Sequence, residues 1–218
     1  MFISDSAIDK FETPNLSNPE QKQIFTPQQV QPQEPEEKII GQYNDTYILI
    51  DTDEGLEIVD QHIAEERYIY EKLKSEKNVI SQMLFVSDVI EISSSESELI
   101  KENLDKFERF GYGIEFLKDT EIIFRKVPQL LAKANPKDIL ADILENIDGD
   151  IDNLEEKILI TTSCKASVKA NTKLSIWQMQ EIIKKWRTTK MPYTCPHGRP
   201  ISRIIPHKEL AGFFQRNK

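Results

Sequence analysis

Apolar and polar positions alternate in the stretch that begins at about residue 38. This period of two predicts three short strands, at Ile39–Gln42, Thr46–Ile50 and Leu56–Val59. Asn44-Asp45 separates the first two runs, and this pair favours the tight turn of a hairpin. From Ala64 to Lys74 the apolar spacing becomes helical, which predicts an amphipathic helix directly after the third strand.

The middle of the chain, from 81 to 154, has the pattern of a strand–helix–strand–strand–helix block. We expect these elements at Met83–Ile92, Ser95–Phe110, Ile114–Leu117, Glu121–Arg125 and Pro136–Ile147. The last third predicts a helix around Cys164, a helix at Ser175–Trp186, a strand at Ile201–Ile205 and a short terminal helix. These elements predict an α+β fold of two lobes. Residues 38–80 and 155–218 would form one lobe, and the inserted residues 81–154 would form the other.

Residues 1–37 differ from the rest of the chain in composition. They hold five of the eleven prolines and no glycine, and six glutamines lie between Gln21 and Gln33. Such a segment has too little apolar surface to offset the entropy of ordering, which predicts a disordered linker. No run approaches 18 apolar residues, so we expect no membrane span. The two cysteines are too few for a disulfide scaffold and favour a reducing, cytoplasmic location.

Charge is distributed unevenly along the chain. The net charge is −9, but Lys157–Lys218 hold 13 Lys and Arg against two acids, a net charge of +11, while the remaining residues carry −20. The acidic total argues against tight DNA binding by this chain alone, because such binding depends on basic side chains at phosphates. The basic last third either folds against the acidic body or offers one basic face to a polyanion.

The densest group of chemically capable residues begins where the third strand ends. Asp60 ends that strand, and His62 and Glu66, four residues apart, fall on one face of the following helix. Two carboxylates and an imidazole at one strand–helix junction suit a divalent metal ion. The alternative is that Asp60 only caps the helix while His62 and Glu66 face solvent, because short His/Glu patterns also occur without a metal.

Both cysteines lie in the last third of the chain. Cys195 and His197 are two residues apart in a loop that contains proline and glycine, so the pair can bind one metal ion. Cys164 lies on an expected helix. Plain burial is the alternative for each cysteine. Spacing alone does not bring these separate segments to the junction at Asp60.

Two of these patterns resemble motifs of the MutL mismatch-repair family. Asp60-Gln61-His62, followed by Glu66 and Glu71, is similar to the family's endonuclease motif, DQHA followed by two residues, E, four residues and E. Ile63 stands in the place of the motif's alanine. The run Cys195–Pro200 is the family's CPHGRP in full. Together the two motifs indicate the C-terminal dimerisation and endonuclease region of that family.

Two weaker matches lie in the expected order. Ser163-Cys164-Lys165 resembles the family's ACR, and the lysine keeps the charge but not the bidentate fork of arginine. Phe214-Gln215-Arg216 matches its FxR near the end of the chain. The resemblance covers about Lys38–Lys218.

The resemblance implies metal-dependent nicking of duplex DNA by phosphodiester hydrolysis, with zinc, manganese or both as the ion. Asp60 and Glu66 would be the catalytic carboxylates. The metal ligands would be Asp60, His62, Glu66, Cys164, Cys195 and His197. The supporting residues would be Glu71, Arg199 and Arg216. The rival function is a metal-stabilised structural dimerisation module without nuclease activity.

A further segment, Gln82–Ser87, resembles the family's clamp-binding peptide, with Ser87 where proline is usual. Gln82, Leu84 and Phe85 would then contact a sliding clamp, and an ordinary buried strand is the alternative. The resemblance also implies a homodimer that acts on duplex DNA, and the distribution of charge predicts that the chain binds duplex DNA weakly by itself. It would work with a mismatch recognition protein and with the family's ATPase domain, in the cytoplasm at the nucleoid.

Overall fold

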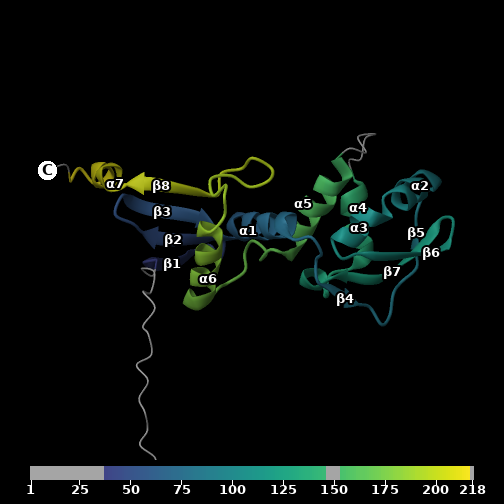
Figure 1. Cartoon of the computed structure of the whole chain (residues 1–218). Coiled ribbons are helices and arrows are strands. Elements are labelled where there is room, and N and C mark those ends of the chain that lie inside the picture. Colours follow the sequence, from purple (N-terminus) through teal and green to yellow (C-terminus); the bar gives the residue numbers. More distant parts are fainter. Residues whose placement is uncertain (1–36, 146–152, 217–218) are drawn as a thin grey trace, which may run out of the picture. The chain divides into compact units, whose positions relative to one another are not determined.

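The hairpin expected from the first apolar runs opens a four-stranded antiparallel sheet (Figure 1). The computed structural model describes residues 37–145 and 153–216, so the expected linker lies, apart from Glu37, outside the described residues. The strands, in the order in which they pair, are β1 (Ile39–Tyr43), β2 (Tyr47–Asp51), β3 (Gly55–Asp60) and β8 (Ser202–Pro206). At the hairpin tip, Asn44 and Asp45 adopt φ values of 49° and 46°, a left-handed backbone that Asn and Asp tolerate.

Two helices pack against this sheet. They are α1 (Gln61–Ser75) and α6 (Ile176–Arg187). Ser175 is the N-cap of α6: its Oγ accepts the N–H of Gln178, and the Gln178 side chain accepts the N–H of Ser175, which is a capping box at the start of the expected helix. The buried cluster between sheet and helices includes Ile48, Ile50, Val59, Ile63, Ala64, Met179, Ile183 and Trp186.

A second antiparallel sheet is centred on β7 (Glu121–Pro128). Its other strands are β4 (Ser81–Met83), β5 (Ile90–Glu91) and β6 (Gly113–Lys118). The helices of this part are α2 (Ser94–Glu102), α3 (Leu104–Arg109), a 3-10 turn at Gln129–Leu131, α4 (Pro136–Leu144) and α5 (Leu154–Ala166). Phe107 and Phe124 each meet the ring of Tyr112 edge-on in the second buried cluster. Helices and sheets in these proportions confirm the α+β class.

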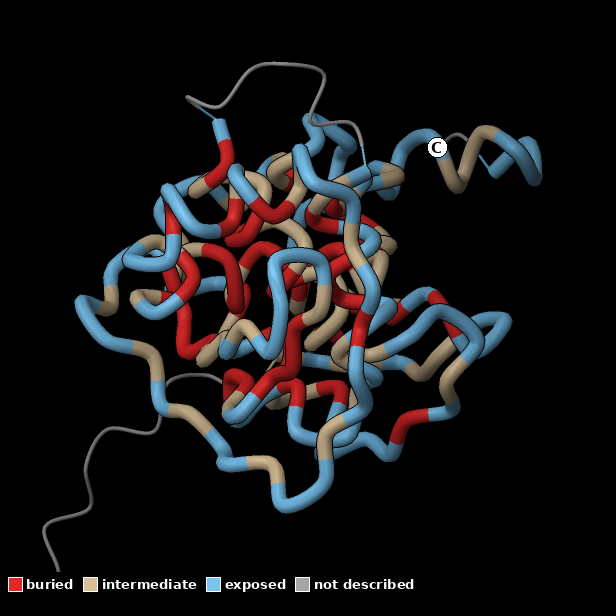
Figure 2. Tube along the Cα trace, turned by 90° about the vertical axis from the view of Figure 1, so that its right-hand side faces the viewer, coloured by how far each residue is buried: buried red, intermediate tan, exposed pale blue. Residues whose placement is uncertain are grey.

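Helix α1 contributes to both buried clusters. Ile63 and Ala64, in its first turn, belong to the cluster under the first sheet, whereas Ile69 and Leu73 belong to the cluster under the second. Figure 2 shows buried residues concentrated where the helices and sheets meet. The described residues form one compact unit, and the boundaries of two lobes stay a prediction. No helix among the described residues is long and apolar enough to cross a membrane.

Three expected elements of the middle block are wrong in extent. The strand expected at Met83–Ile92 is two short strands, β4 and β5, joined by a loop. The helix expected at Ser95–Phe110 is divided at Asn103, whose side-chain amide donates to the carbonyl of Leu99 and whose backbone (φ −125°, ψ 23°) leaves the helical region. The helix expected at Pro136–Ile147 is α4, which ends at Leu144, while 146 and 147 lie outside the described residues.

Candidate metal centre

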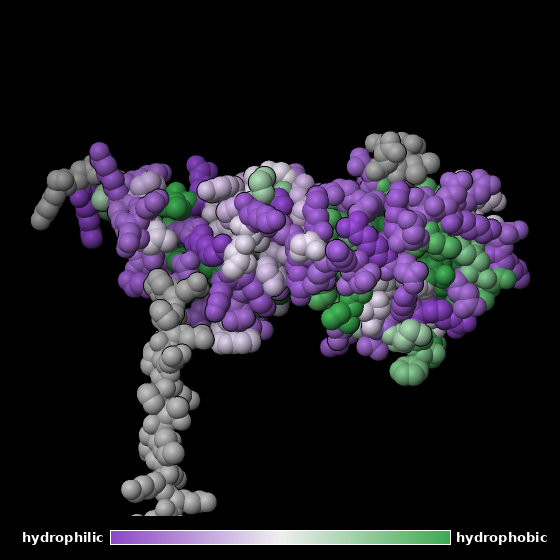
Figure 3. All heavy atoms as spheres, in the orientation of Figure 1, coloured by the Kyte–Doolittle hydropathy of each residue, from purple (hydrophilic) through white to green (hydrophobic). Residues whose placement is uncertain are grey.

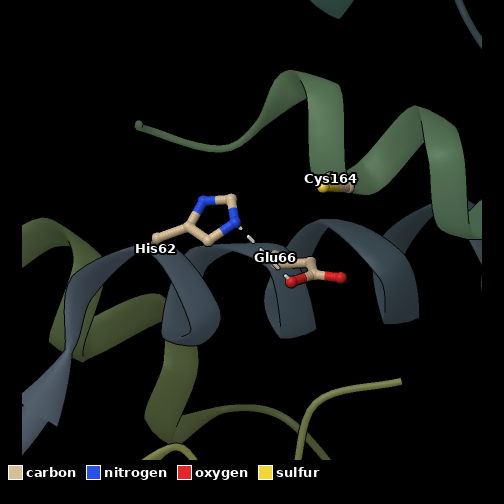
Figure 4. Close-up of side chains that lie close together, drawn as sticks. All are labelled: His62, Glu66 and Cys164. Carbon is tan, nitrogen blue, oxygen red and sulfur yellow. Dashed lines mark ion pairs between the residues drawn. The ribbon is translucent and has the colours of Figure 1, made fainter. Parts of the chain in front are cut away.

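The junction between β3 and α1 sets the position of the candidate ligands. Asp60 is the N-cap of α1, and its Oδ1 accepts the N–H of Ile63 at 3.0 Å. The helix therefore begins at Gln61, earlier than the sequence pattern indicated. His62 and Glu66 lie one turn apart on this helix and point to the same side (Figure 4).

The first group of possible ligands, here called the helix group, consists of His62, Glu66 and Cys164. One ligand atom of each lies within 4.8 Å of the others. His62 Nε2 is 3.9 Å from Glu66 Oε2, and Cys164 approaches from α5, which crosses over α1 (Figure 4). An imidazole nitrogen, a thiol and a carboxylate from two helices thus converge on one point, a donor set suited to zinc.

The other nitrogen of His62 is held by the backbone that follows α5. Nδ1 lies 2.9 Å from the carbonyl oxygen of Val168 and 2.9 Å from Oγ of Ser167. A carbonyl oxygen can only accept, so Nδ1 donates its proton to Val168 and Nε2 is left free to bind a metal. A hydrogen bond with Cys164 is the largest cause that raises the pKa of His62. Burial opposes it, and the hydrogen bond with the Val168 carbonyl raises the pKa further.

The second group, here called the turn group, consists of Glu66, Cys195 and His197. Their ligand atoms also lie within 4.8 Å of one another, and His197 Nδ1 is 3.2 Å from Glu66 Oε1. Cys195 is buried, with 1% of its surface exposed. The chain reverses here: Gly198 donates its N–H to the carbonyl of Cys195, and Cys195 donates its own to the carbonyl of Arg199. This tight turn brings Cys195 and His197 to the same carboxylate.

Glu66 belongs to both groups. Its side chain is fully buried, and neither carboxylate oxygen has a hydrogen-bond partner among the described residues. Oε2 faces the helix group and Oε1 faces the turn group. A buried carboxylate without partners is costly, and a cation bound to its oxygens would remove that cost. The residues present therefore fit one or two divalent cations, with Glu66 as the shared ligand.

Asp60 belongs to neither group of described residues, and the contact that the structure records for its side chain is the helix cap. Its assignment as a metal ligand stays a prediction. The arginine of the CPHGRP run does lie at the centre. A hydrogen bond with the Cys195 side chain, and after it the charges of Cys195, Glu66 and Cys164, raise the pKa of Arg199, which is an exposed residue.

The remaining predicted site residues lie apart from these groups. Glu71, on a later turn of α1, binds backbone N–H groups at Lys190 and Met191 instead of a ligand position. Arg216 follows α7 (His207–Phe213) at the far end of β8, a strand of five residues and thus about 16 Å long. The expectation that Arg216 supports the site therefore stays a prediction.

The expected clamp-binding residues lie on β4 and the loop after it, in the part built around β7. Gln82 is exposed, Leu84 is half-buried, and Phe85 is 99% exposed. Ser87 lies beyond the end of β4, and its hydroxyl donates a hydrogen bond to the carbonyl of Phe124. Figure 3 shows an apolar group protruding at the lower edge of this part of the molecule. The alternative of an ordinary buried strand is wrong for this segment, because Phe85 and the neighbouring Val86 are exposed.

Several residues that hold the centre in place are not apparent from the sequence. Ser167 and Val168 hold His62, and Glu65 accepts the N–H of Val168. Gln61, fully buried, donates to the carbonyls of Asp45 and Thr172, which ties the hairpin to the segment after α5. In the sequence, the one feature that points to a role for Gln61 is its place between Asp60 and His62, two candidate ligands.

The comparisons with known proteins identify the family of the chain. The chain matches the family model described as MutL C terminal dimerisation domain over residues 40–174. The DNA mismatch repair protein MutL of Clostridium botulinum (strain Kyoto / Type A2) is 40% identical over 186 residues, which are 82% of this chain and 28% of that protein.

Proteins of the same name from two other clostridia are also similar. The one from Clostridium beijerinckii is 37% identical over 170 residues, 75% of this chain and 26% of that protein. The one from Clostridium acetobutylicum is 35% identical over 173 residues, 76% of this chain and 28% of that protein. The chain thus spans less than a third of the length of these relatives, and it belongs to the family of MutL C-terminal dimerisation domains.

Proposed function

We propose that this chain is the endonuclease and dimerisation part of a DNA mismatch repair protein, and that it nicks duplex DNA by metal-dependent phosphodiester hydrolysis. The observation that carries the proposal is Glu66, a buried carboxylate without hydrogen-bond partners between two sets of nitrogen and sulfur donors. Burying a carboxylate without hydrogen bonds destabilises a fold, and a bound cation would offset that cost.

The donor atoms suit two kinds of divalent ion. Cys164 and Cys195 favour zinc, because thiolates are strong zinc ligands, whereas Glu66 and an additional carboxylate from Asp60 would accept manganese. A bound divalent ion would supply a Lewis acid and would lower the pKa of a water molecule towards neutrality. The native ion is therefore proposed to be zinc, manganese or one of each.

The chain's own residues would have separable tasks. His62 presents Nε2 because Val168 holds its Nδ1. Arg199, exposed beside Cys195 and Glu66, would meet the phosphate and offset negative charge as the P–O bond breaks. Asp60 uses Oδ1 for its cap, and its other oxygen would hold a cation or take the proton of the attacking water.

The rival proposal is a metal-stabilised dimerisation module without nuclease activity. The position of Asp60 favours it, because a capping carboxylate outside both ligand groups has a structural role of its own. A structural zinc site needs only its ligands and no further carboxylate. The two proposals therefore differ in what they require of Asp60.

Nicking of supercoiled plasmid in the presence of manganese, by wild type and Asp60→Asn, separates the two. Asparagine keeps the capping oxygen and removes the charge, so fold and dimer should persist while nicking is lost. Asp53→Asn, the same substitution in the turn before β3, is the matched control and should nick like wild type.

Zinc content completes the test, and Asp60→Asn should lose less zinc than Cys195→Ser. Equal nicking by wild type and Asp60→Asn would mean that the activity does not arise from the proposed centre, and it would favour the structural module. Absence of nicking by wild type, even with the ATPase domain and the sliding clamp added, would contradict the nuclease.

The partners are proposed with the same function. The chain would form a homodimer, bind duplex DNA weakly and in a salt-sensitive manner, and contact a sliding clamp through Gln82, Leu84 and Phe85. It would work with the ATPase domain and a mismatch recognition protein, in the cytoplasm at the nucleoid. Light scattering of the purified chain checks the dimer, and sub-micromolar binding to random duplex at physiological salt would contradict the weak affinity.

A further inference from the structure

Two carboxylates of α1 that belong to neither ligand group bind backbone N–H groups in two separate segments of the chain. Glu71 accepts the N–H of Lys190 at 2.7 Å through Oε2 and that of Met191 at 3.0 Å through Oε1. Glu65 accepts the N–H of Val168 at 2.6 Å. Hydrogen bonds to an ionised acceptor are shorter and stronger than neutral ones, so both contacts anchor the segments they touch.

The segment that Glu71 anchors leads directly to the turn group. Cys195 follows Lys190 by five residues, and between them Thr194 accepts a hydrogen bond at 2.7 Å from Nε of Arg67. Arg67 is nearly buried, and its Nη1 is 3.8 Å from Glu71 Oε1, so the two side chains support one another. Helix α1 thus holds the approach to Cys195 at two places while it supplies Glu66.

The segment that Glu65 anchors controls the helix group instead. The peptide of Val168 is held from both sides: its N–H donates to Glu65, and its carbonyl accepts from Nδ1 of His62. Moving Val168 would release the imidazole. Each ligand group therefore has its own anchor on α1, Glu65 for the helix group and Glu71 for the turn group.

We propose that Glu65 and Glu71 are positioning residues, each of which sets the metal affinity of one ligand group without binding the metal. This inference rests on the proposed metal function. Partners that orient ligands in this way typically change metal affinity about 10–100-fold when they are removed. The effect of each carboxylate should fall on its own group.

Cobalt(II) titration of the full chain tests the assignment, because the cobalt–thiolate absorption reports the group that still has its cysteine. A Cys164→Ser background reports the turn group, and a Cys195→Ser background reports the helix group. Glu71→Met should weaken cobalt binding about 10–100-fold in the first background and less than threefold in the second. Glu65→Met should show the reverse pattern.

Glu65 binds one N–H group and Glu71 binds two, so the glutamine variants of the two residues should differ in metal affinity. A glutamine has one acceptor oxygen, which suffices for the single N–H that Glu65 binds but not for the two that Glu71 binds. Glu65→Gln should therefore retain near-wild-type affinity in the helix group, while Glu71→Gln should remain weak in the turn group. Glu76→Met is the matched control: Glu76 is the C-cap of the same helix, its side chain pairs with Lys72 at 3.9 Å, and the variant should leave both affinities unchanged.

A second measurement does not depend on metal. In chelator, Glu71→Met should speed hydrogen exchange at the amides of Lys190 and Met191 but not at Val168, and Glu65→Met should do the opposite. Equal losses in both cobalt backgrounds, or unchanged affinities with unchanged exchange, would overturn the inference while leaving the metal function intact. A wild-type chain that binds no cobalt would overturn the metal function and the positioning role together.

Discussion

The two ligand groups share Glu66 and use the same three kinds of donor atom, but the chain holds them differently. In the helix group, His62 and Cys164 lie on α1 and α5, where regular backbone hydrogen bonds fix the positions of the side chains. In the turn group, Cys195 and His197 lie on a short turn outside any helix, closed by the N–H of Gly198 and by an isolated bridge between Thr194 and Pro200.

This difference separates two ways of building a metal ligand set. The spacing of His62 and Glu66 is a property of the helix and survives small changes elsewhere. Both groups also use contacts between distant residues, His62 with Val168 and Glu71 with Met191, but Cys195 and His197 have no helix that fixes their spacing. The helix group should therefore be preorganised without metal, and the turn group should gain more order when metal binds.

The largest expected effect comes from Glu66→Gln, which removes the shared charge. Both groups should lose metal, by more than about 100-fold in affinity, because each loses its only carboxylate. In chelator, the variant should unfold at the same or a higher temperature than wild type, since a buried amide costs less than a buried carboxylate without partners.

Cobalt titration and thermal unfolding in chelator measure both effects of Glu66→Gln, with Glu76→Gln as the control. Retention of one tight metal ion would show that the groups do not share Glu66. A lower unfolding temperature in chelator would contradict the account of its burial.

Removal of metal from the wild-type chain should have the next largest effect. Hydrogen exchange should quicken through 190–200, where a turn supports the ligands, and change little at 62–66, where helical hydrogen bonds persist. Exchange measured by mass spectrometry with and without chelator checks the difference. Equal protection of the two segments in both states would contradict the contrast between the groups.

Gly198→Ala should affect the turn group alone. Gly198 has φ of +80°, a left-handed conformation that costs a residue with a Cβ about 1–2 kcal/mol, while its Cβ would meet no atom within 4 Å. Since about 1.4 kcal/mol corresponds to a tenfold change in a dissociation constant, the cobalt affinity of the turn group in the Cys164→Ser background should fall about tenfold. Gly198→Asn should lower the cobalt affinity less, because asparagine tolerates this conformation. A similar loss in the Cys195→Ser background would mean that the two groups are not held independently.

The smallest effect is expected for Ser167→Ala. Its hydroxyl lies 2.9 Å from Nδ1 of His62, but the carbonyl of Val168 lies equally close and remains in the variant. Cobalt affinity of the helix group should fall by less than about threefold, at the weak end of what outer partners contribute. A loss as large as that of Glu65→Met would show that Ser167, and not the Val168 peptide, orients the imidazole.

Local features of the fold could be predicted well from the sequence. Asn44-Asp45 forms the hairpin turn, and Ser175 with Gln178 forms the capping box, because both depend on residues within four positions of one another. The error at 83–92 has a physical cause. That run has the composition of a strand, but its pairing with β7 continues for only one residue after Met83, where Leu84 donates its N–H to the carbonyl of Arg125. At Ser87 the side chain, and not the backbone, bonds to the carbonyl of Phe124.

By itself, the sequence determined which donor atoms are available and how some of them are spaced: His62 and Glu66 one helical turn apart, Cys195 and His197 on one turn of the chain. Only the tertiary structure decided that both sets meet at Glu66. It also placed Asp60 at a helix cap, and it sent Arg216 to the far end of β8. The reason is the range of the interactions. Helical spacing follows from backbone geometry, whereas the meeting of α1 with residues more than 100 positions later depends on how two buried clusters pack against one helix.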